Sequence, residues 1–298
     1  MKINGVEIED TFAEAFQMWM ARVLITAESL EWAYTAARSA VGFGTSVIMC
    51  PSECGIDVEV PSEKTPDGRP GVTIIICTSK KKSLGEQLLA RISQCVLTAP
   101  TTAAFNALED PEITFPTGRQ IRYFGDGFEE KGEIGGRTVW KIPVMEGEFI
   151  IEETFGGKKG VAGGNFLILS ENLKAGLEAA KRAVDVISKV EGVITPFPGG
   201  ICRSGSKVGS LKYKFMHAST NHQYCPTLRE KVTDSKIPEG VNCVYEIVIN
   251  GLTLESVKEA MAVGIREAAK VPGVKMISAG NYGGKLGQYK IHLHELFK

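Results

Sequence analysis

The sequence lacks the paired cysteines that mark zinc sites and disulfide frameworks. Its seven cysteines form no CxxC pair, and an odd number does not suit a disulfide-bonded scaffold. Several interrupt apolar runs, as Cys77 does, and we interpret them as small buried residues in a reducing compartment. Cys50 and Cys54 have no second cysteine or histidine pair at a suitable spacing, so no metal site is predicted.

Long apolar runs and an excess of one charge are also missing. No run reaches the length of about 20 residues that a membrane helix needs, and the N-terminus does not resemble a signal peptide. We therefore expect a cytoplasmic protein with no membrane contact. The formal net charge is −1, which argues against a nucleic-acid-binding surface. With 43% hydrophobic and 23% charged residues, the composition is that of a globular protein.

Nucleotide-binding and hydrolase motifs are incomplete. Gly200 and Gly205 have the glycine spacing of a P-loop, but that motif needs lysine before serine, and here Ser206 precedes Lys207. No GxGxxG opens a helix after a strand, and no GxSxG is present. Without a cofactor fingerprint, we expect direct group transfer that depends on positioning and electrostatics.

What the sequence does contain is an internal repeat. Residues 23–25 align with 166–168 at an offset of 143, and the helical pattern behind each aligns without a gap. Further along, the apolar positions within 84–92 match those within 257–265 at an offset of 173, on one helical face. Each unit gives the order strand, helix, strand, repeated once. This order predicts an α+β fold of two ferredoxin-like (split βαβ) lobes related by the repeat.

The repeat divides the chain into three parts. We predict a first ferredoxin-like lobe over 1–102, a β-rich segment over 103–164 that bridges the lobes or builds an oligomer contact, and a second ferredoxin-like lobe over 165–298. In the first lobe we expect a helix capped by Ser29 and ended by Gly42. The other elements expected there are strands 46–49 and 72–77, a helix from 84 to about 94, and the stretch 95–98. In the second lobe they are strands 166–169, 193–195, 244–249 and 274–279, with helices 173–190 and 254–270.

Glu246 is the most informative acid. In a strand it shares a face with Val244 and Val248, because strand side chains alternate. On a covered face its pKa would rise, and a neutral carboxyl can donate a hydrogen bond to a developing oxyanion. The aligned residue in the first lobe is Thr73, so the fold itself does not demand an acid there. A glutamate on a solvent-facing edge remains the alternative interpretation.

Glycine-rich loops supply the binding candidates. The loop at 195–209 mixes glycines with hydroxyls and cations, and 280–287 is a second loop of similar composition. A dense turn at 65–71 and the glycine run at 160–164 add others. Such loops suit anionic or amide-bearing ligands, although plain surface loops share this composition. The candidates for substrate binding are Asp67, Arg69, Asn165, Arg203, Ser204, Ser206, Lys207, Asn281, Tyr282 and Lys285.

Ten strings along the chain resemble one known family. They are EDTFAEAF (9–16), VIMCP (47–51), TPDGRPG (65–71), QCVLTAPTTA (94–103), FGDG (124–127), GVAGGNF (160–166), ITPFPGG (194–200), SGSKVG (204–209), VYEIVING (244–251) and ISAGNYGGKLG (277–287). Over essentially the whole chain the sequence resembles the formylmethanofuran:tetrahydromethanopterin N-formyltransferases.

The resemblance implies a reversible transfer of a formyl group between formylmethanofuran and N5 of tetrahydromethanopterin, in archaeal one-carbon metabolism. Both C1 carriers are substrates, with no bound cofactor or metal. It also implies ferredoxin-like lobes and a homo-dimer or homotetramer with active sites at subunit contacts. Through the YEIVI string it implies that Glu246 is the catalytic acid. We then expect pterin N5 to attack the formamide carbon, while protonated Glu246 and loop N–H groups stabilise the tetrahedral oxyanion. Arg69, Arg203, Lys207 and Lys285 would bind the acidic tails of the substrates.

Three other interpretations stay open from the sequence. The chain could transfer a formyl group to a folate-type carrier, which assays with each pterin would distinguish. It could be a non-catalytic ferredoxin-like protein that binds small molecules, which measurable formyl exchange would exclude. It could also be a subunit of a formyltransferase/hydrolase complex, which co-purifying partners would reveal.

Overall fold

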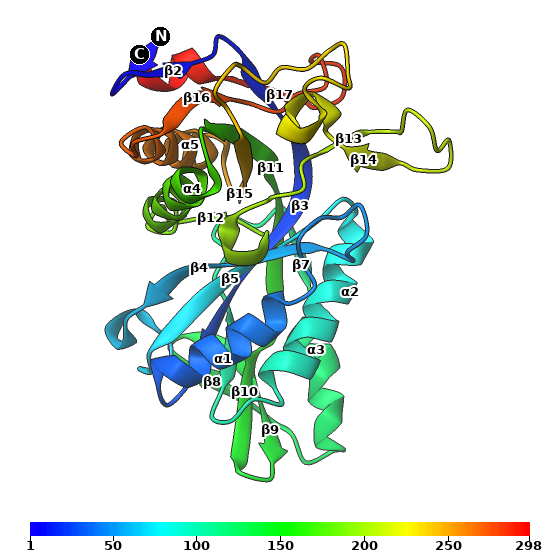
Figure 1. The fold of residues 1–298 in the computed structure, drawn as a ribbon. Coiled ribbons are helices and arrows are strands. Elements are labelled where there is room, and N and C mark those ends of the chain that lie inside the picture. Colours follow the sequence, from blue (N-terminus) through cyan, green and yellow to red (C-terminus); the bar gives the residue numbers. More distant parts are fainter. The chain divides into compact units, whose positions relative to one another are not determined.

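The computed structural model describes all residues 1–298, which form two compact units (Figure 1). The terminal unit comprises Met1–Gln17 and Val161–Lys298, and the central unit comprises Met18–Gly160. The two longest strands, β3 (Phe12–Thr26) and β11 (Phe155–Ser170), each begin in one unit and end in the other. Both units are mixtures of helices and sheet.

The central unit is built on four antiparallel strands in the order β4-β5-β3-β6. Helices α1 and α2 pack against them, and a mainly aliphatic core fills the space between. Beyond β6 the sheet continues through β10, which is parallel to β6, into β9 and β8. The bounds are β4 (Glu53–Val60), β5 (Gly71–Thr78), β6 (Ala103–Asn106), β7 (Ile113–Phe115), β8 (Glu130–Ile134), β9 (Arg137–Val144), β10 (Gly147–Glu152), α1 (Leu30–Val41), α2 (Lys81–Arg91) and α3 (Thr117–Ile121).

Helix α1 begins and ends where the sequence predicts. The Ser29 hydroxyl accepts a hydrogen bond from the Trp32 N–H (3.4 Å), and Gly42 follows the last helical residue. Four alanines, which have little side chain to exclude a close neighbour, form its buried face against the sheet.

Two expectations for this unit are wrong. Residues 46–49 form a turn in which the N–H groups of Met49 and Cys50 both bond to the Ser46 carbonyl, and the strand begins only at Glu53. The apolar run there is too short to define a period, and Met49 is 84% exposed. The stretch 95–98 continues α2 as a π-turn and loop, so the closing strand is β6 instead. Of the segment predicted at 103–164, residues 103–160 are grouped with the central unit and 161–164 with the terminal unit.

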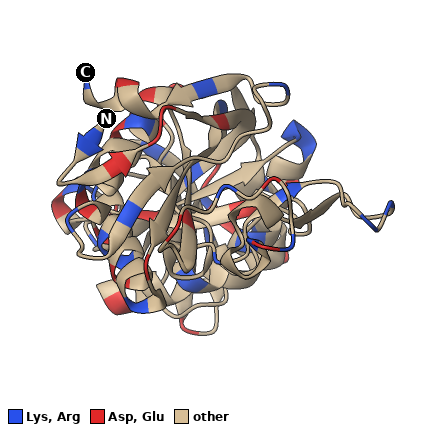
Figure 2. Cartoon of the chain, turned by 45° about the horizontal axis from the view of Figure 1, so that its top comes forward, with Lys and Arg blue, Asp and Glu red and all other residues tan.

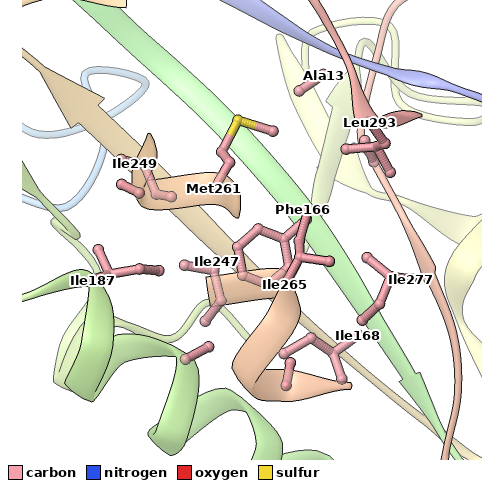
Figure 3. Close-up of a cluster of buried hydrophobic side chains, with 14 of the residues drawn as sticks. Ala13, Phe166, Ile168, Ile187, Ile247, Ile249, Met261, Ile265, Ile277 and Leu293 are labelled. Carbon is pink, nitrogen blue, oxygen red and sulfur yellow. The ribbon is translucent and has the colours of Figure 1, made fainter. Parts of the chain in front are cut away.

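The terminal unit has the strand order β16-β11-β15-β12, again antiparallel. Helices α4 and α5 lie side by side on one face of this sheet (Figure 1). Between helices and sheet, Phe166, Ile247 and Ile265 belong to one continuous core (Figure 3). The bounds are β12 (Val193–Ile194), β15 (Cys243–Gly251), β16 (Val274–Ser278), α4 (Leu173–Ile187) and α5 (Leu254–Ala268).

The two chain ends complete this unit. Strands β1 (Lys2–Ile3) and β2 (Val6–Ile8) form a hairpin whose second strand lies parallel to β16. Strand β17 (Tyr289–His292) pairs with the start of β3. The first and last residues therefore lie close together (Figure 1), as the contact between the Met1 amine and His294 also shows (3.2 Å).

The other face of the terminal sheet is covered by the long connection between β12 and β15. Tyr224, Ile237 and Val241 from this connection pack on Leu167 and Leu169 of β11. The same connection contains a protruding hairpin, β13 (Ser206–Val208) and β14 (Ala218–Thr220), which the sequence did not predict (Figure 1).

Equivalent elements of the two units keep the offsets found in the sequence. Helix α4 begins 143 residues after α1, and α5 begins 173 residues after α2. Acidic and basic residues are mixed over the whole ribbon, in keeping with the net charge of −1 (Figure 2). The longest helices have 15 residues, and none is long and apolar enough to span a bilayer.

Candidate active site

Glu246 lies in the middle of β15, with Leu167 of β11 directly opposite. On the other side of the strand, its N–H and C=O groups bond to the C=O and N–H of Cys202 (2.9 and 2.8 Å). Its neighbour Ile247 points into the core beneath the helices (Figure 3). Because strand side chains alternate, Glu246 points to the opposite face of the sheet.

The surroundings of Glu246 favour its neutral form. Burial raises the pKa of Glu246 to about 7, and a hydrogen bond with the Cys202 side chain lowers this pKa only in part. The residue still keeps some solvent-accessible surface. A carboxyl in this state changes protonation near neutral pH, which is what a general acid needs. The raised pKa agrees with the sequence analysis, and the catalytic role stays a prediction.

A second buried acid, Glu14 of β3, lies inside the glycine-rich loop 280–287. Its Oε2 accepts hydrogen bonds from the N–H groups of Tyr282 (2.7 Å) and Gly284 (2.8 Å). Its Oε1 accepts from Leu286 (2.5 Å) and Gly287 (2.6 Å). Burial alone would raise the pKa of Glu14, but the four backbone hydrogen bonds together lower it, so the group is ionised.

Two asparagines fix the start of the same loop. The Asn165 side chain accepts a hydrogen bond from Gly280 N–H (2.6 Å) and donates to the Gly280 carbonyl (3.1 Å). The Asn281 side chain donates to the Phe12 carbonyl (3.1 Å) and accepts from Gly283 N–H (3.1 Å). Both amides were predicted to bind substrate. In this structure both amides form hydrogen bonds with backbone groups and so hold the start of the loop in place.

Tyr282 lies on the same loop and is near enough to Glu246 for the charge of that carboxyl to act on its hydroxyl. Its ring contacts that of Phe16, with centroids 6.0 Å apart. Burial raises the pKa of the Tyr282 hydroxyl, and the negative charges of Glu246 and Glu14 raise it further. A phenol held neutral in this way remains a hydrogen-bond donor over the whole physiological pH range.

Arg203 and Ser204 immediately follow Cys202, so they are held close to Glu246. Both line a groove of 690 Å³ beside helix α4. Apolar side chains, among them Phe197 and Ile201, form most of its lining. Tyr245, which faces the helices, also lines it, so the groove does not open on the Glu246 face of the sheet. Cys202 is the residue that the groove and the Glu246 surroundings share.

The other predicted binding residues are placed elsewhere or have partners of their own. Asp67 and Arg69 belong to the central unit and pair with each other (2.8 Å), and Asp67 also accepts from the Thr26 hydroxyl (2.6 Å). Lys207 donates to the Ser219 hydroxyl (2.6 Å). Ser206 pairs with Thr220 across the hairpin, and Lys285 is exposed on the glycine-rich loop.

Sequence reasoning missed Glu14, Phe16 and Cys202 as contributors. The available signal for Glu14 was an isolated acid inside a long apolar strand, in a chain that also contains a glycine-dense loop. For Cys202 the only signal was its place within the loop at 195–209, and nothing in the sequence indicated its pairing with Glu246.

Two family models together match nearly the whole chain. The model described as "Formylmethanofuran-tetrahydromethanopterin formyltransferase" matches residues 1–144, and that described as "FTR, proximal lobe" matches 147–296. Curated formylmethanofuran–tetrahydromethanopterin formyltransferases from Methanothermus fervidus and Archaeoglobus fulgidus are 61% and 60% identical over 297 residues. In both cases the match covers all of this chain and all of the relative.

Solved structures agree with this match. The formyltransferase from Methanosarcina barkeri superimposes with a TM-score of 0.98 at 57% identity, covering 100% of both chains. A chain of the formyltransferase/hydrolase complex from Methylorubrum extorquens, solved with methylofuran, gives 0.95 at 42% identity, covering 100% of this chain and 99% of that chain. Identities of this size over full length exclude a likeness of fold alone. The chain belongs to the formylmethanofuran–tetrahydromethanopterin formyltransferase family.

Proposed function

We propose that Glu246 is the acid catalyst of this formyltransferase. The enzyme transfers a formyl group between formylmethanofuran and tetrahydromethanopterin, which are substrates of one-carbon metabolism in methanogens, and no cofactor is indicated. The single observation that carries the proposal is a carboxyl on the sheet face opposite the helices whose pKa, about 7, lies near neutrality.

The chemistry assigns this carboxyl a defined task. The lone pair of pterin N5 attacks the formamide carbon, a C–N5 bond forms, and the carbonyl electrons move to the oxygen. Protonated Glu246 donates a hydrogen bond to this oxyanion. When the intermediate collapses, the bond to the methanofuran nitrogen breaks and that amine leaves with a proton. The amine gains one proton and N5 loses one, and protonated Glu246 can give its proton to the leaving amine and then, as the carboxylate, take the proton that N5 loses.

The sequence analysis expects loop N–H groups to stabilise the oxyanion, but those of loop 280–287 are not suited to this role. Four of them already bond to Glu14. In our proposal the second donor is the Tyr282 hydroxyl. Burial and the charge of Glu246 raise the pKa of this hydroxyl, so it stays protonated and can donate. Arg203 and Lys285, both exposed, are the cations that we propose for the acidic tails of the substrates.

We also propose that the two units are ferredoxin-like lobes derived from one repeat. The matching strand orders, β4-β5-β3-β6 and β12-β15-β11-β16, and the offsets of 143 and 173 residues between equivalent helices support this. A cytoplasmic location is in line with seven free cysteines, of which four are buried.

A homo-oligomer is the assembly that we propose. The tip of the β13–β14 hairpin exposes Leu211, Tyr213 and Phe215, which are 80%, 52% and 77% accessible in the single chain. Apolar side chains on an arm of this kind favour burial against another protomer. The related Methylorubrum protein forms a complex with other subunits, but the relatives at about 60% identity are named as the formyltransferase itself.

Replacing Glu246 by glutamine tests the mechanism. The amide keeps the shape and a hydrogen-bond donor but cannot transfer a proton, so we expect kcat to fall by about 10²- to 10⁴-fold. Glu255→Gln, an exposed acid in the first turn of α5, is the matched control and should retain full activity. Formyl transfer to tetrahydromethanopterin is followed in both variants. Unchanged turnover of a folded Glu246→Gln enzyme would remove Glu246 from the chemistry.

A further inference from the structure

Glu14 is a buried charge with no ion pair within 4 Å, although Lys290 of β17 lies opposite it in the sheet. It lies within the long apolar strand β3, is only 1% exposed, and forms no ion pair. Ionised carboxylates are rarely buried unless other groups compensate for the lost hydration. Here the hydrogen bonds to the carboxylate come from backbone N–H groups of a loop that lies about 270 residues later in the chain, as the separation between Glu14 and Gly284 shows.

The loop wraps around this carboxylate in a regular way. Tyr282 and Gly284 donate to one oxygen, and Leu286 and Gly287 donate to the other. Successive backbone N–H groups that converge in this manner form an anion-binding concavity. In many proteins such a concavity holds a phosphate or a carboxylate from a ligand. In this protein it already holds a side chain of its own.

The glycines of the loop have a structural explanation in this arrangement. Gly284 has φ +70°, a left-handed conformation that brings its N–H toward Glu14. A Cβ at Gly287 would lie 2.7 Å from Glu14 Cγ and 2.5 Å from the Ala15 carbonyl oxygen, which leaves no room for a side chain. At Gly284 and Gly287, glycine therefore suits the conformation that the loop adopts around Glu14.

We propose that Glu14 is a positioning residue for catalysis, which shapes the loop 280–287 around itself and thereby fixes Tyr282, the proposed second donor to the oxyanion. The inference rests on the proposed role of Glu246. Two contacts from one face of β3 reach the same residue, because Glu14 binds the Tyr282 N–H while Phe16, two positions along, packs on its ring. Backbone and ring of Tyr282 are thus both fixed by β3.

Hydrogen exchange on the wild-type protein tests the loop without any substitution. The amides of Tyr282, Gly284, Leu286 and Gly287 should exchange on the order of 100-fold more slowly than that of Lys285, whose N–H is not bonded to Glu14. Uniformly fast exchange across 280–287 would overturn the proposal. This measurement does not depend on activity.

A double-mutant cycle tests the coupling to Tyr282. In Glu14→Gln the side-chain NH₂ group replaces an oxygen that accepts from two N–H groups, and an NH₂ group cannot accept these hydrogen bonds. The loop amides should therefore lose their protection against hydrogen exchange. We expect kcat to fall by roughly 100-fold with a much smaller change in KM, because displacements of about 1 Å in an active site have effects of this size. Tyr282→Phe should lower kcat in the wild-type background, but by less than about threefold when Glu14→Gln is already present. Glu7→Gln, an exposed acid of β2, is the control.

The outcomes separate this inference from the proposed function. If the effects of Glu14→Gln and Tyr282→Phe on kcat multiply in the double variant, Glu14 acts independently of Tyr282. The inference then fails, whatever the result for Glu246→Gln. If Glu246→Gln retains full turnover, the proposed mechanism fails even when the loop amides are protected. Should Glu14→Gln not fold, Gly284→Ala strains the loop and leaves the carboxylate in place. It should also lower kcat and loop protection, and an unchanged enzyme would contradict the proposal.

Discussion

Cys202 and Glu246 are joined by a reciprocal pair of backbone hydrogen bonds, of 2.8 and 2.9 Å. The pair extends the sheet by one residue beyond β12 and fixes the loop at 195–209 to the strand that carries the proposed acid. It also places the Cys202 thiol where it forms a hydrogen bond with the Glu246 side chain. The loop and the acid are therefore one structural unit.

Removing this thiol should change the pH dependence of the enzyme. The hydrogen bond with Cys202 lowers the pKa of Glu246, so in Cys202→Ala that pKa should rise further above about 7. Because the proposed acid works in its protonated form, the decline of kcat/KM at high pH should then begin at a higher pH. The backbone pair does not involve the side chain and is retained. A pH–rate profile measures the shift, with Cys95→Ala in the central unit as the control. A shift to lower pH would contradict the assigned interaction.

The raised pKa of Glu246 also predicts a pH-dependent stability. Its pKa is about 7 in the folded protein and 4.5 in the reference state, so the folded state holds the proton more tightly. The stability that this gives is fully present below pH 4.5 and is lost as pH rises through 7. Since one pKa unit corresponds to about 1.4 kcal/mol, the loss is at most about 3.5 kcal/mol. Glu246→Gln should therefore be stabilising relative to wild type at pH 8 and not at pH 4.5, as urea unfolding at both values would show. An equal effect at the two pH values would argue against burial of the carboxyl.

The local features of this protein could be predicted from the sequence, and its long-range pairings could not. Helix α1, its Ser29 cap and the strand around Glu246 follow from periodicity and capping chemistry over a few residues. The strand predicted at 46–49 failed because three apolar residues in a row define no period, and here they are exposed on a turn. The hydrogen bonds between Glu14 and loop 280–287 join opposite ends of the chain. No local sequence pattern predicts which acid will accept hydrogen bonds from which backbone N–H groups.

In the central unit the position equivalent to Glu246 is occupied by Thr73, which belongs to a buried ion pair's hydrogen-bond network. Thr73 donates to Asp57 (3.1 Å), and Asp57 in turn pairs with Arg22 (2.7 Å). The Asp57 side chain is fully buried and that of Arg22 is 13% exposed. Asp57→Asn removes the negative charge from this buried pair, so we expect a loss of about 3 kcal/mol in the free energy of unfolding. Denaturant unfolding measures it, with Asp185→Asn on α4 as a partly exposed control. A loss below 1 kcal/mol would mean that other groups neutralise Arg22.

The β13–β14 hairpin gives a test of the proposed assembly. Its tip carries Leu211, Tyr213 and Phe215, which have little to pack against within the chain apart from the contact between the two aromatic rings (5.9 Å). Burial of such side chains contributes roughly 25 cal/mol per Å² of apolar surface, so three of them can decide whether a protomer associates. Replacing all three by serine should shift the protein to a smaller oligomer at a given concentration.

Light scattering coupled to size-exclusion chromatography measures this change. Met145→Ser, at a fully exposed apolar position of the central unit, is the matched control and should leave the mass unchanged. The hairpin adjoins the loop that carries Arg203, so a smaller oligomer should also show a raised KM if substrates bind at a subunit contact. An unchanged mass in the triple variant would mean that the hairpin is not an assembly arm. The exposed apolar tip would then need a different partner.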